Sequence, residues 1–224
     1  MLACKQSMHA TLFRDRHHAG QALALSLAAQ AAAANTLVLA LPRGGVPVAY
    51  EVARALGAPL DVIVVRKLGV PGHEEYAMGA VASGGIRVLN DEVVRGMRIA
   101  AASIDATTAR ERVEVERRER VYRGGAAALA IAGRELIVVD DGLATGATMR
   151  AAVRALRQQR PARIVVAAPV CSRSACTALE TQADAVMCIH VPADFQAVGD
   201  WYEDFEQTSD DEVCQLLRAS GGLA

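Results

Sequence analysis

The sequence predicts an α/β fold in which helices cover both faces of a parallel sheet of about five strands. Five short runs of Val, Ile, Leu and Ala lack polar alternation, which is typical of strands buried on both faces. These runs are residues 37–41, 61–65, 136–140, 163–170 and 185–191. Helical patterning separates most of them, at residues 46–56, 147–159 and 172–182. Because strands and helices alternate with short connections, we expect right-handed crossovers and a doubly wound, Rossmann-like sheet.

Further segments flank this core. An Ala- and Leu-rich stretch predicts a helix over residues 16–33, which Asp15 is suited to cap. Residues 76–82 and 86–89 predict a hairpin-like pair joined by a Ser-Gly-Gly turn. Residues 208–218 predict a capped terminal helix.

Length and composition fit one water-soluble domain with a small appended lobe. The 224 residues are 52% hydrophobic and 22% charged, which argues against disorder. Lys and Arg total 24 against 25 Asp and Glu, a net charge of −1, so nucleic-acid binding is disfavoured and any anion site must be local. The apolar block at 22–34 is too short to span a bilayer, and the first residues lack a signal-peptide pattern. We therefore expect a cytoplasmic protein without a membrane partner.

The cysteines do not indicate a metal or redox centre. None of them forms a C-x-x-C pair, so zinc and dithiol chemistry are disfavoured. Scattered cysteines in apolar stretches usually fill space in a reducing compartment. The five are Cys4, Cys171, Cys176, Cys188 and Cys214.

The segment 109–123 is strongly charged, with six Arg and four Glu between positions 110 and 123. It contains three Glu–Arg pairs at i,i+4 spacing in the favourable order, namely Glu114–Arg118, Glu116–Arg120 and Glu119–Arg123. A solvated helix carrying its own ion pairs explains this pattern. The alternatives are an arginine-bearing flap and a contact with another subunit.

The strongest functional signal is LIVVDDGLATGATMRAA at residues 136–152. A buried strand delivers Asp140 and Asp141 at its carboxyl end, where open α/β sheets bind ligands. The loop that follows is built of small residues and enters a helix, so its backbone N–H groups can converge on one phosphate. The loop residues are Gly142, Leu143, Ala144, Thr145, Gly146, Ala147 and Thr148.

Paired acids beside a phosphate cradle describe a ribose 5-phosphate ligand, since carboxylates accept hydrogen bonds from a diol or bind Mg²⁺. No Lys follows the glycines as a P-loop requires, and the dinucleotide-binding pattern G-x-G-x-x-G is absent. The alternative without ligand binding is a capped turn that closes a βα unit. It leaves the two acids before T-G-x-T unexplained.

The stretch VVDDGLATGAT closely resembles the phosphoribosyl-diphosphate (PRPP) motif of the type I phosphoribosyltransferases. The wider resemblance covers about residues 36–192. It implies that Asp140 and Asp141 hold the ribose hydroxyls, and Mg²⁺ through PRPP and water, while residues 142–148 hold the 5-phosphate. It also implies one phosphoribosyltransferase domain over 1–224, with a small hood formed by residues 1–35 and 193–224.

A second strand-end motif, LALPRGGVPVA at residues 39–49, places Arg43, Gly44 and Gly45 between a strand and a helix. Arg43 can make charge-assisted bonds to an anion. In the resembled family this loop binds pyrophosphate and often holds a cis non-proline peptide, here Pro42–Arg43 or its neighbour. A glycine-rich turn with a surface arginine is the alternative explanation.

A third segment, VRKLGVPGHEEYAMGAV at residues 65–81, has the composition of a mobile polar lid over 69–75. Its R-K-x-G, P-G and E-Y elements resemble the adenine enzymes of the family. This resemblance implies that Arg66 and Lys67 bind pyrophosphate, and that Lys67 and Glu75 are catalytic, with Glu75 as acid/base at the leaving nitrogen. His73 is a rival proton carrier.

The base is not determined by the sequence. Enzymes of the family that act on 6-oxopurines typically carry an Asp at the position of Ala144, so the alanine disfavours hypoxanthine and guanine. Aromatic residues gather at 191–205, and Phe195 and Trp201 are candidates for stacking on a base. A tail that packs its aromatic rings on the core is the alternative.

These features predict a glycosyltransferase of the pentosyltransferase class, which transfers phosphoribosyl between PRPP and a nitrogenous base with Mg²⁺ and releases pyrophosphate. The base could be a purine, and we expect a homo-oligomer such as a dimer. The alternative is a regulatory protein that binds PRPP or a nucleotide without catalysis. A subunit of a larger assembly, suggested only by the charged segment, is a third possibility.

Overall fold

A computed structural model describes residues 12–28 and 35–221 of the chain. Its centre is a five-stranded sheet in which every neighbouring pair is parallel, with the order β2-β1-β6-β7-β8. The strands are β1 (Thr36–Ala40), β2 (Leu60–Val62), β6 (Glu135–Val139), β7 (Arg163–Val170) and β8 (Ala185–His190). The predicted parallel sheet is therefore confirmed.

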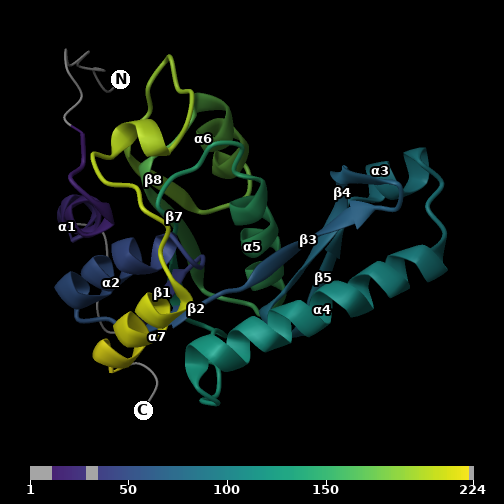
Figure 1. The fold of residues 1–224 in the computed structure, drawn as a ribbon, viewed down its shortest axis with the longest axis horizontal. Helices are drawn as coiled ribbons and strands as arrows, with labels where there is room; N and C mark the ends of the chain where they lie inside the picture. Colours follow the sequence, from purple (N-terminus) through teal and green to yellow (C-terminus); the bar gives the residue numbers. More distant parts are fainter. Residues whose placement is uncertain (1–11, 29–34, 222–224) are drawn as a thin grey trace.

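Helices cover both faces of this sheet, as Figure 1 shows. One face packs against α1 (Arg16–Leu27), α2 (Gly45–Leu56) and α7 (Asp210–Ala219), and the other against α5 (Ala147–Gln158) and α6 (Arg173–Glu180). Alternate side chains of each strand enter opposite layers. In β1, Val38 and Ala40 join the first layer, whereas Leu37 and Leu39 join the second. Burial on both faces explains the uninterrupted apolar runs.

A second body projects from the main sheet, to the right in Figure 1, and is called the arm (residues 65–123). It contains a three-stranded antiparallel sheet in the order β3-β4-β5 and two helices. These elements are β3 (Val65–Val70), β4 (His73–Ala82), β5 (Ile86–Leu89), α3 (Asp91–Gly96) and α4 (Ala101–Arg123).

Two predictions for this region were wrong. The apolar run 61–65 is not one strand, because the chain leaves the main sheet after β2 and enters the arm at β3. The segment 69–75 is not a polar loop, because β3 and β4 pair directly and only Pro71 and Gly72 turn between them. Gly72 has φ +78°, a conformation that suits glycine. The Gly, Pro and charged residues that indicated a loop lie in and around this exposed turn.

Several other predictions are confirmed with small shifts of boundary. Asp15 caps α1 by accepting a hydrogen bond from His18 N at 2.7 Å, although part of the predicted helix 16–33 lies outside the described residues. The hairpin of β4 and β5 pairs Ala82 with Ile86. Ser209 caps α7. The helix predicted around 109–123 is longer than expected, since α4 begins at Ala101.

The segments that were predicted to form the hood meet over β8. Phe13 forms an isolated bridge with Tyr202, and its N–H donates to the carbonyl of Trp201 at 2.9 Å. The Phe13 ring lies 5.4 Å from that of His190, on β8. Residues 1–11 and 29–34, which belong to the predicted hood, lie outside the described residues, as does Cys4.

The charged helix α4 carries two of its three predicted ion pairs. Arg118 contacts Glu114 at 2.7 Å and Arg123 contacts Glu119 at 2.6 Å. Arg120 instead donates from Nε to the backbone carbonyl of Glu116. Arg117 also reaches Glu114 at 2.7 Å, at i,i+3 spacing. Most of the helix is solvated, as its sequence predicts.

The carboxyl end of α4 is anchored to the main sheet by a buried ion pair. Arg123 Nε lies 2.8 Å from Asp61 Oδ1, and the two side chains are only 7% and 2% exposed. The same guanidinium donates to the carbonyl of Val62, while Asp61 accepts from the N–H groups of Val62 and Leu129. The pair is therefore fully hydrogen-bonded, the condition under which a buried ion pair is tolerated.

No helix in the described ranges is both long and apolar enough to cross a membrane.

Replacing Arg123 by Leu should destabilise the protein by about 3–5 kcal/mol, because Asp61 would remain buried without its cation. Urea unfolding at neutral pH would measure this loss. Arg117→Leu removes an arginine of the same helix from an exposed pair and is the matched control, for which we expect little change. Equal losses in the two variants would contradict the role of Asp61–Arg123 as an anchor.

Candidate functional site

The acid pair lies where β6 ends, at the carboxyl edge of the main sheet. Asp140 N donates to the carbonyl of Ala167 on β7 at 3.3 Å, and Asp141 N donates to Asp140 Oδ1 at 2.9 Å. The β6 strand is central in the sheet, with β1 and β7 as its neighbours. The two carboxylates are thus placed by the most buried part of the fold, as the sequence predicted.

The Pro42–Gly45 loop lies directly against these acids. A Cβ added to Gly44 would collide with Asp141 Oδ2, and one added to Gly45 would lie 2.7 Å from the carbonyl oxygen of Val139. Glycine therefore suits both positions, because the backbone passes the Asp141 carboxylate at Gly44 and the Val139 carbonyl at Gly45 without room for a side chain. The peptide Pro42–Arg43 is cis, one of the two bonds that the resemblance indicated.

Arg16 of α1 occupies the other side of Asp141. Its Nε lies 2.8 Å from Asp141 Oδ2, and the two side chains are 11% and 14% exposed. The guanidinium also donates to the carbonyl of Glu206 at 2.6 Å and stacks on the Phe205 ring, 3.9 Å from its centre. Arg16 thus supplies the counter-charge of one acid and ties α1 to the segment before α7.

The segment before α7, residues 198–202, also lies against the acid pair. Tyr202 Oη donates to the backbone carbonyl of Asp141 at 2.6 Å, and its burial raises the pKa of the phenol. A Cβ on Gly142 would collide with Val198, so the start of the phosphate loop passes close beneath residues 198–202. The segment is therefore fitted to the loop backbone.

The phosphate loop 142–148 is held at its base and open at its top. Leu143 N donates to the carbonyl of Val170, and its own carbonyl accepts from Ser172 N, at 2.9 and 2.8 Å. Within the described residues, no hydrogen bond occupies the N–H groups of Ala144, Thr145, Gly146 and Thr148. Gly146 adopts φ +64° and caps α5. Free N–H groups at the positive end of a helix form a ready anion site.

The electrostatics of the acid pair are unusual for carboxylates. Burial raises the pKa of Asp140 well above its ordinary value, and the negative charge of Asp141 raises it further. Arg16 opposes this shift only in part. These effects shift Asp140 toward its protonated form relative to an exposed aspartate, and a protonated carboxyl can donate as well as accept a hydrogen bond.

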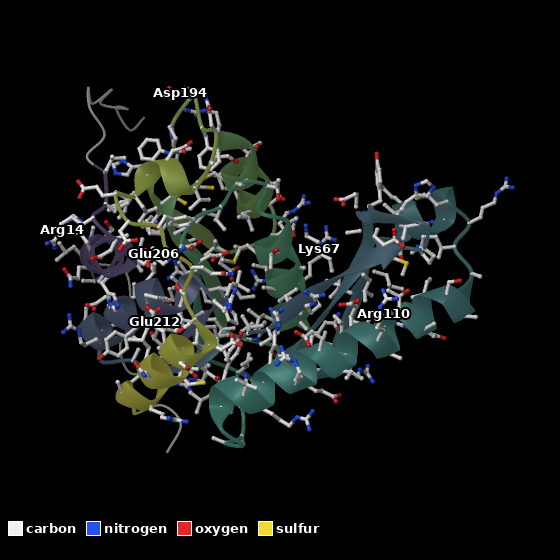
Figure 2. The ribbon with its side chains drawn as sticks, viewed as in Figure 1. Arg14, Lys67, Arg110, Asp194, Glu206 and Glu212 are labelled. Atoms are coloured by element: carbon white, nitrogen blue, oxygen red, sulfur yellow. The ribbon has the colours of Figure 1, made fainter. Side chains whose placement is uncertain are left out.

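The predicted pyrophosphate-binding side chains diverge. Arg43 directly precedes Gly44, the residue that approaches Asp141. The Arg43 guanidinium, however, lies 3.9 Å from Asp210 at the start of α7. Arg66 pairs with Glu111 of α4 at 2.9 Å. Lys67, the next residue of β3, is exposed and lines a cleft beside α5 (Figure 2). Arg66 and Lys67 thus face opposite sides of the arm sheet, as successive strand residues do.

Within the described ranges, no hydrogen bond or ion pair joins the remaining candidates to the acid pair. Glu75 and His73 are exposed on the first half of β4, near the turn of the arm hairpin. Phe195 is half-buried in the loop after β8. Trp201 stacks on His190, with ring centres 5.3 Å apart, so one face of its ring is already covered. The observed stacking matches the alternative in which the tail packs on the core.

Two residues that contact the acid pair were missed by the sequence reasoning, Arg16 and Tyr202. Neither belongs to a recognisable motif, and both are far from Asp141 in the chain. A single arginine early in a predicted helix and a single tyrosine in an aromatic tail give no local signal of a contact with an acid.

The donor set fits Mg²⁺ only as an ion shared with a phosphorylated ligand. The described residues contain no group of three or more His, Cys, Asp or Glu side chains arranged to hold a metal. The two carboxylates of Asp140 and Asp141 are oxygen donors, and Mg²⁺ is commonly bound by one or two carboxylates together with substrate phosphates and water. The residues present therefore fit such a shared ion.

Two strand-end loops meet at an acid pair beside an open N–H cradle, an arrangement that in α/β proteins suits a phosphorylated ligand. The family model described as "phosphoribosyl transferase domain" matches residues 15–212. The chain belongs to the phosphoribosyl transferase family.

Similar proteins agree with this assignment. A Mycobacterium tuberculosis protein, provisionally named a phosphoribosyl transferase, is 48% identical over 206 residues, which is 92% of this chain and 46% of that protein. The chain thus spans about half the length of these relatives. The bifunctional protein PyrR of Chloroflexus aurantiacus is 33% identical over 128 residues, 56% of this chain and 64% of that protein.

A solved structure, that of TT1426 from Thermus thermophilus, is 45% identical to this chain. It superposes with a TM-score of 0.84 over 92% of this chain and 98% of that one. Both the main sheet and its surroundings therefore follow an architecture already known from a crystal structure.

The raised pKa of Asp140 makes a prediction about pH. In the unfolded chain the carboxyl ionises near its ordinary pKa, so the unfolded state binds fewer protons than the folded state as the pH rises above about 4. The wild type should lose stability relative to Asp140→Asn over this range, by about 1.4 kcal/mol per unit of raised pKa. Urea unfolding between pH 4 and pH 8 would measure the difference.

The exposed Asp194→Asn is the control for loss of a negative charge, and its difference from the wild type should stay nearly flat with pH. A flat difference for Asp140→Asn as well would show that Asp140 ionises normally in the folded protein.

Proposed function

We propose that the chain binds PRPP at the carboxyl edge of the main sheet and transfers its phosphoribosyl group to or from a nitrogenous base. The observation that carries this proposal is the contact of the Gly44 backbone with Asp141 beside the open N–H groups of residues 142–148. One ligand with a diol, a 5-phosphate and a diphosphate would satisfy all of these groups together. PRPP is such a ligand.

Each part of the site has a separate task in this proposal. Asp140 and Asp141 accept hydrogen bonds from the ribose hydroxyls, and residues 142–148 bind the 5-phosphate through backbone N–H groups. Gly44 and Gly45 allow the diphosphate to approach the backbone, and Arg43 leaves Asp210 to pair with it. Lys67 adds positive charge from the arm, and Arg66 contributes if its pair with Glu111 opens.

In the reaction a bond forms between the anomeric carbon of the ribose and a nitrogen of the base, while the bond to the pyrophosphate oxygen breaks. Pyrophosphate leaves with the bonding electron pair. The protein positions the partners and stabilises charge in a water-poor site, rather than forming covalent bonds itself. When bound through PRPP and water to Asp140 and Asp141, Mg²⁺ would neutralise charge on the leaving group.

The proton on the base nitrogen is assigned to Glu75. Because Glu75 is exposed near the hairpin turn of the arm, this role requires that the turn approach the sheet edge during turnover. His73, two residues before Glu75 on β4, is the rival carrier. Phe195 and Trp201 are proposed as base contacts, and a purine other than a 6-oxopurine remains the favoured base. A cytoplasmic homodimer is the proposed form.

A second function, regulation by binding PRPP or a nucleotide without catalysis, is favoured by one observation. Arg66 and Asp141 are both already paired, with Glu111 and Arg16, while Glu75 stands apart from the acids. A binding protein needs the acid pair and the phosphate loop but does not need the arm. Incubation with PRPP, Mg²⁺ and a panel of purines and pyrimidines, with pyrophosphate release as readout, separates the two functions.

The double variant Asp140→Asn, Asp141→Asn should abolish PRPP binding and keep the fold. Amides cannot replace the negative charge for the diol and Mg²⁺, whereas removing two neighbouring acids relieves their repulsion. Calorimetric titration with Mg²⁺ and PRPP would measure affinity, and the melting temperature would check the fold. Undiminished affinity in the double variant would refute the ribose assignment for both functions.

Arg43→Ala should weaken binding of PRPP and pyrophosphate by roughly ten-fold or more, since it removes a charge-assisted bond. Binding of a nucleoside monophosphate should change little, because its single phosphate uses residues 142–148. Titration of the three ligands into wild type and variant provides the comparison. Equal losses for all three would reject this division of labour between the loops.

A further inference from the structure

A cleft lies between α5 and the arm, beside the sheet-edge site, and most of its lining residues have no part in that site. It has a volume of about 100 Å³. Its walls are small and apolar side chains of β4, β5 and α5, together with Asn90 and three cations, Lys67, Arg150 and Arg154. It shares Lys67 and Ala147 with the residues proposed above for PRPP, but neither Arg43 nor the acid pair lines it. Figure 2 shows Lys67 in the space between α5 and the arm.

The cations of this cleft come from two elements and are not neutralised by the protein. Arg150 and Arg154 are one turn apart on α5 and so share a face, opposite Lys67 of β3. None of the lining residues, all of them within the described ranges, is acidic. No ion pair or hydrogen bond joins these three side chains to another described residue. By contrast Arg157, on the next turn of α5, pairs with Asp184 at 2.7 Å.

Arg150 carries the most specific signal. Its Nε atom is buried and has no hydrogen-bond partner among the described residues. A buried charged donor without an acceptor is costly and rare in folded proteins. The other walls of the cleft offer little beyond the Asn90 amide, so no described residue supplies the acceptor that Arg150 lacks, and a bound ligand could supply it.

The size of the cleft limits what that acceptor can be. Sites for whole small molecules usually measure about 300–1,000 Å³, whereas this one is about 100 Å³. Since one water occupies about 30 Å³ of liquid, the space suits a single tetrahedral oxyanion. Two guanidinium groups and an ammonium match the charge and the donor geometry of a phosphate.

We propose that the cleft between α5 and the arm is a second anion site that binds one phosphate group through Arg150, Arg154 and Lys67. The ligand is inorganic phosphate or the phosphate of a nucleotide whose remainder stays outside the cleft. This proposal does not depend on the binding of PRPP at the sheet edge. A bound phosphate would link α5, which begins at the phosphate loop, to the strand β3 of the arm.

The test needs a readout at Arg150, because phosphate would also bind residues 142–148. Correlation spectra of the arginine Nε–H groups in full-length, ¹⁵N-labelled protein provide it, and the Arg150 signal is identified by its loss in Arg150→Gln. Inorganic phosphate should shift this signal in a saturable way. Arg154→Gln should weaken that titration by roughly ten-fold, since one charge-assisted bond is removed.

Arg157→Gln is the matched control, because it removes the same charge from the same helix outside the cleft. It should leave the titration of Arg150 within about two-fold of the wild type, the size expected for an exposed charge. An Arg150 signal that does not respond to phosphate, or equal weakening by Arg154→Gln and Arg157→Gln, would overturn the proposal.

Two further measurements distinguish the possible sources of the phosphate and separate the cleft from the sheet-edge site. Tighter binding of adenosine 5′-diphosphate than of phosphate at Arg150 would make a nucleotide the ligand, and equal binding would make it the free ion. The double variant Arg150→Gln, Arg154→Gln should still bind Mg²⁺ and PRPP within about two-fold of the wild type. A parallel loss of PRPP affinity would assign these arginines to the sheet-edge site and reject a second one. If the wild type binds no PRPP at all, the proposed function fails and the phosphate titration still decides the cleft.

Discussion

The contact on which the site depends is the approach of the Gly44 backbone to the carboxylate of Asp141. It joins the loops after β1 and β6, which are adjacent strands of the main sheet. Because a Cβ at Gly44 would collide with Asp141, the two loops can be this close only with glycine present. The parallel pairing of Ala40 with Val139 sets their relative height. The register of the buried parallel sheet thus fixes the position of the acid pair relative to the glycine loop.

Negative charge at this edge is balanced by groups that come from elsewhere in the chain. Arg16 from α1 pairs with Asp141, and the burial of Asp140 favours its neutral form. One acid is therefore compensated by a cation, and the pKa of the other is shifted toward protonation, two effects that lower the repulsion between neighbouring carboxyls. A ligand that brings hydroxyl groups must compete with Arg16 for Asp141, so α1 takes part in whatever binds there.

The sequence was informative wherever the local pattern determined the structure. Uninterrupted apolar runs predicted β1, β6, β7 and β8, and the small-residue loop after Asp141 predicted the cradle before α5. It was misleading at residues 61–75, where an apolar run continues through a change of sheet and polar residues form paired strands. Hydrophobicity shows that Ile63 and Val64 are buried but not that they connect the main sheet to the arm sheet. The contacts of Arg16 and Tyr202, and the place of Arg150 in the cleft beside the arm, could not be predicted because each depends on a residue or element distant in the chain.

The stacking of Trp201 on His190 gives the protein an optical feature of its own. It is the single tryptophan of the chain, and its neighbour Tyr202 hydrogen-bonds the carbonyl of Asp141. Burial lowers the pKa of His190, so the imidazole beneath the indole is mainly neutral at neutral pH and quenches its emission less than an imidazolium would. Any event that displaces residues 198–202 from the acid pair changes the surroundings of this one fluorophore. The intrinsic emission of the unlabelled protein therefore reports on the covering of its sheet edge.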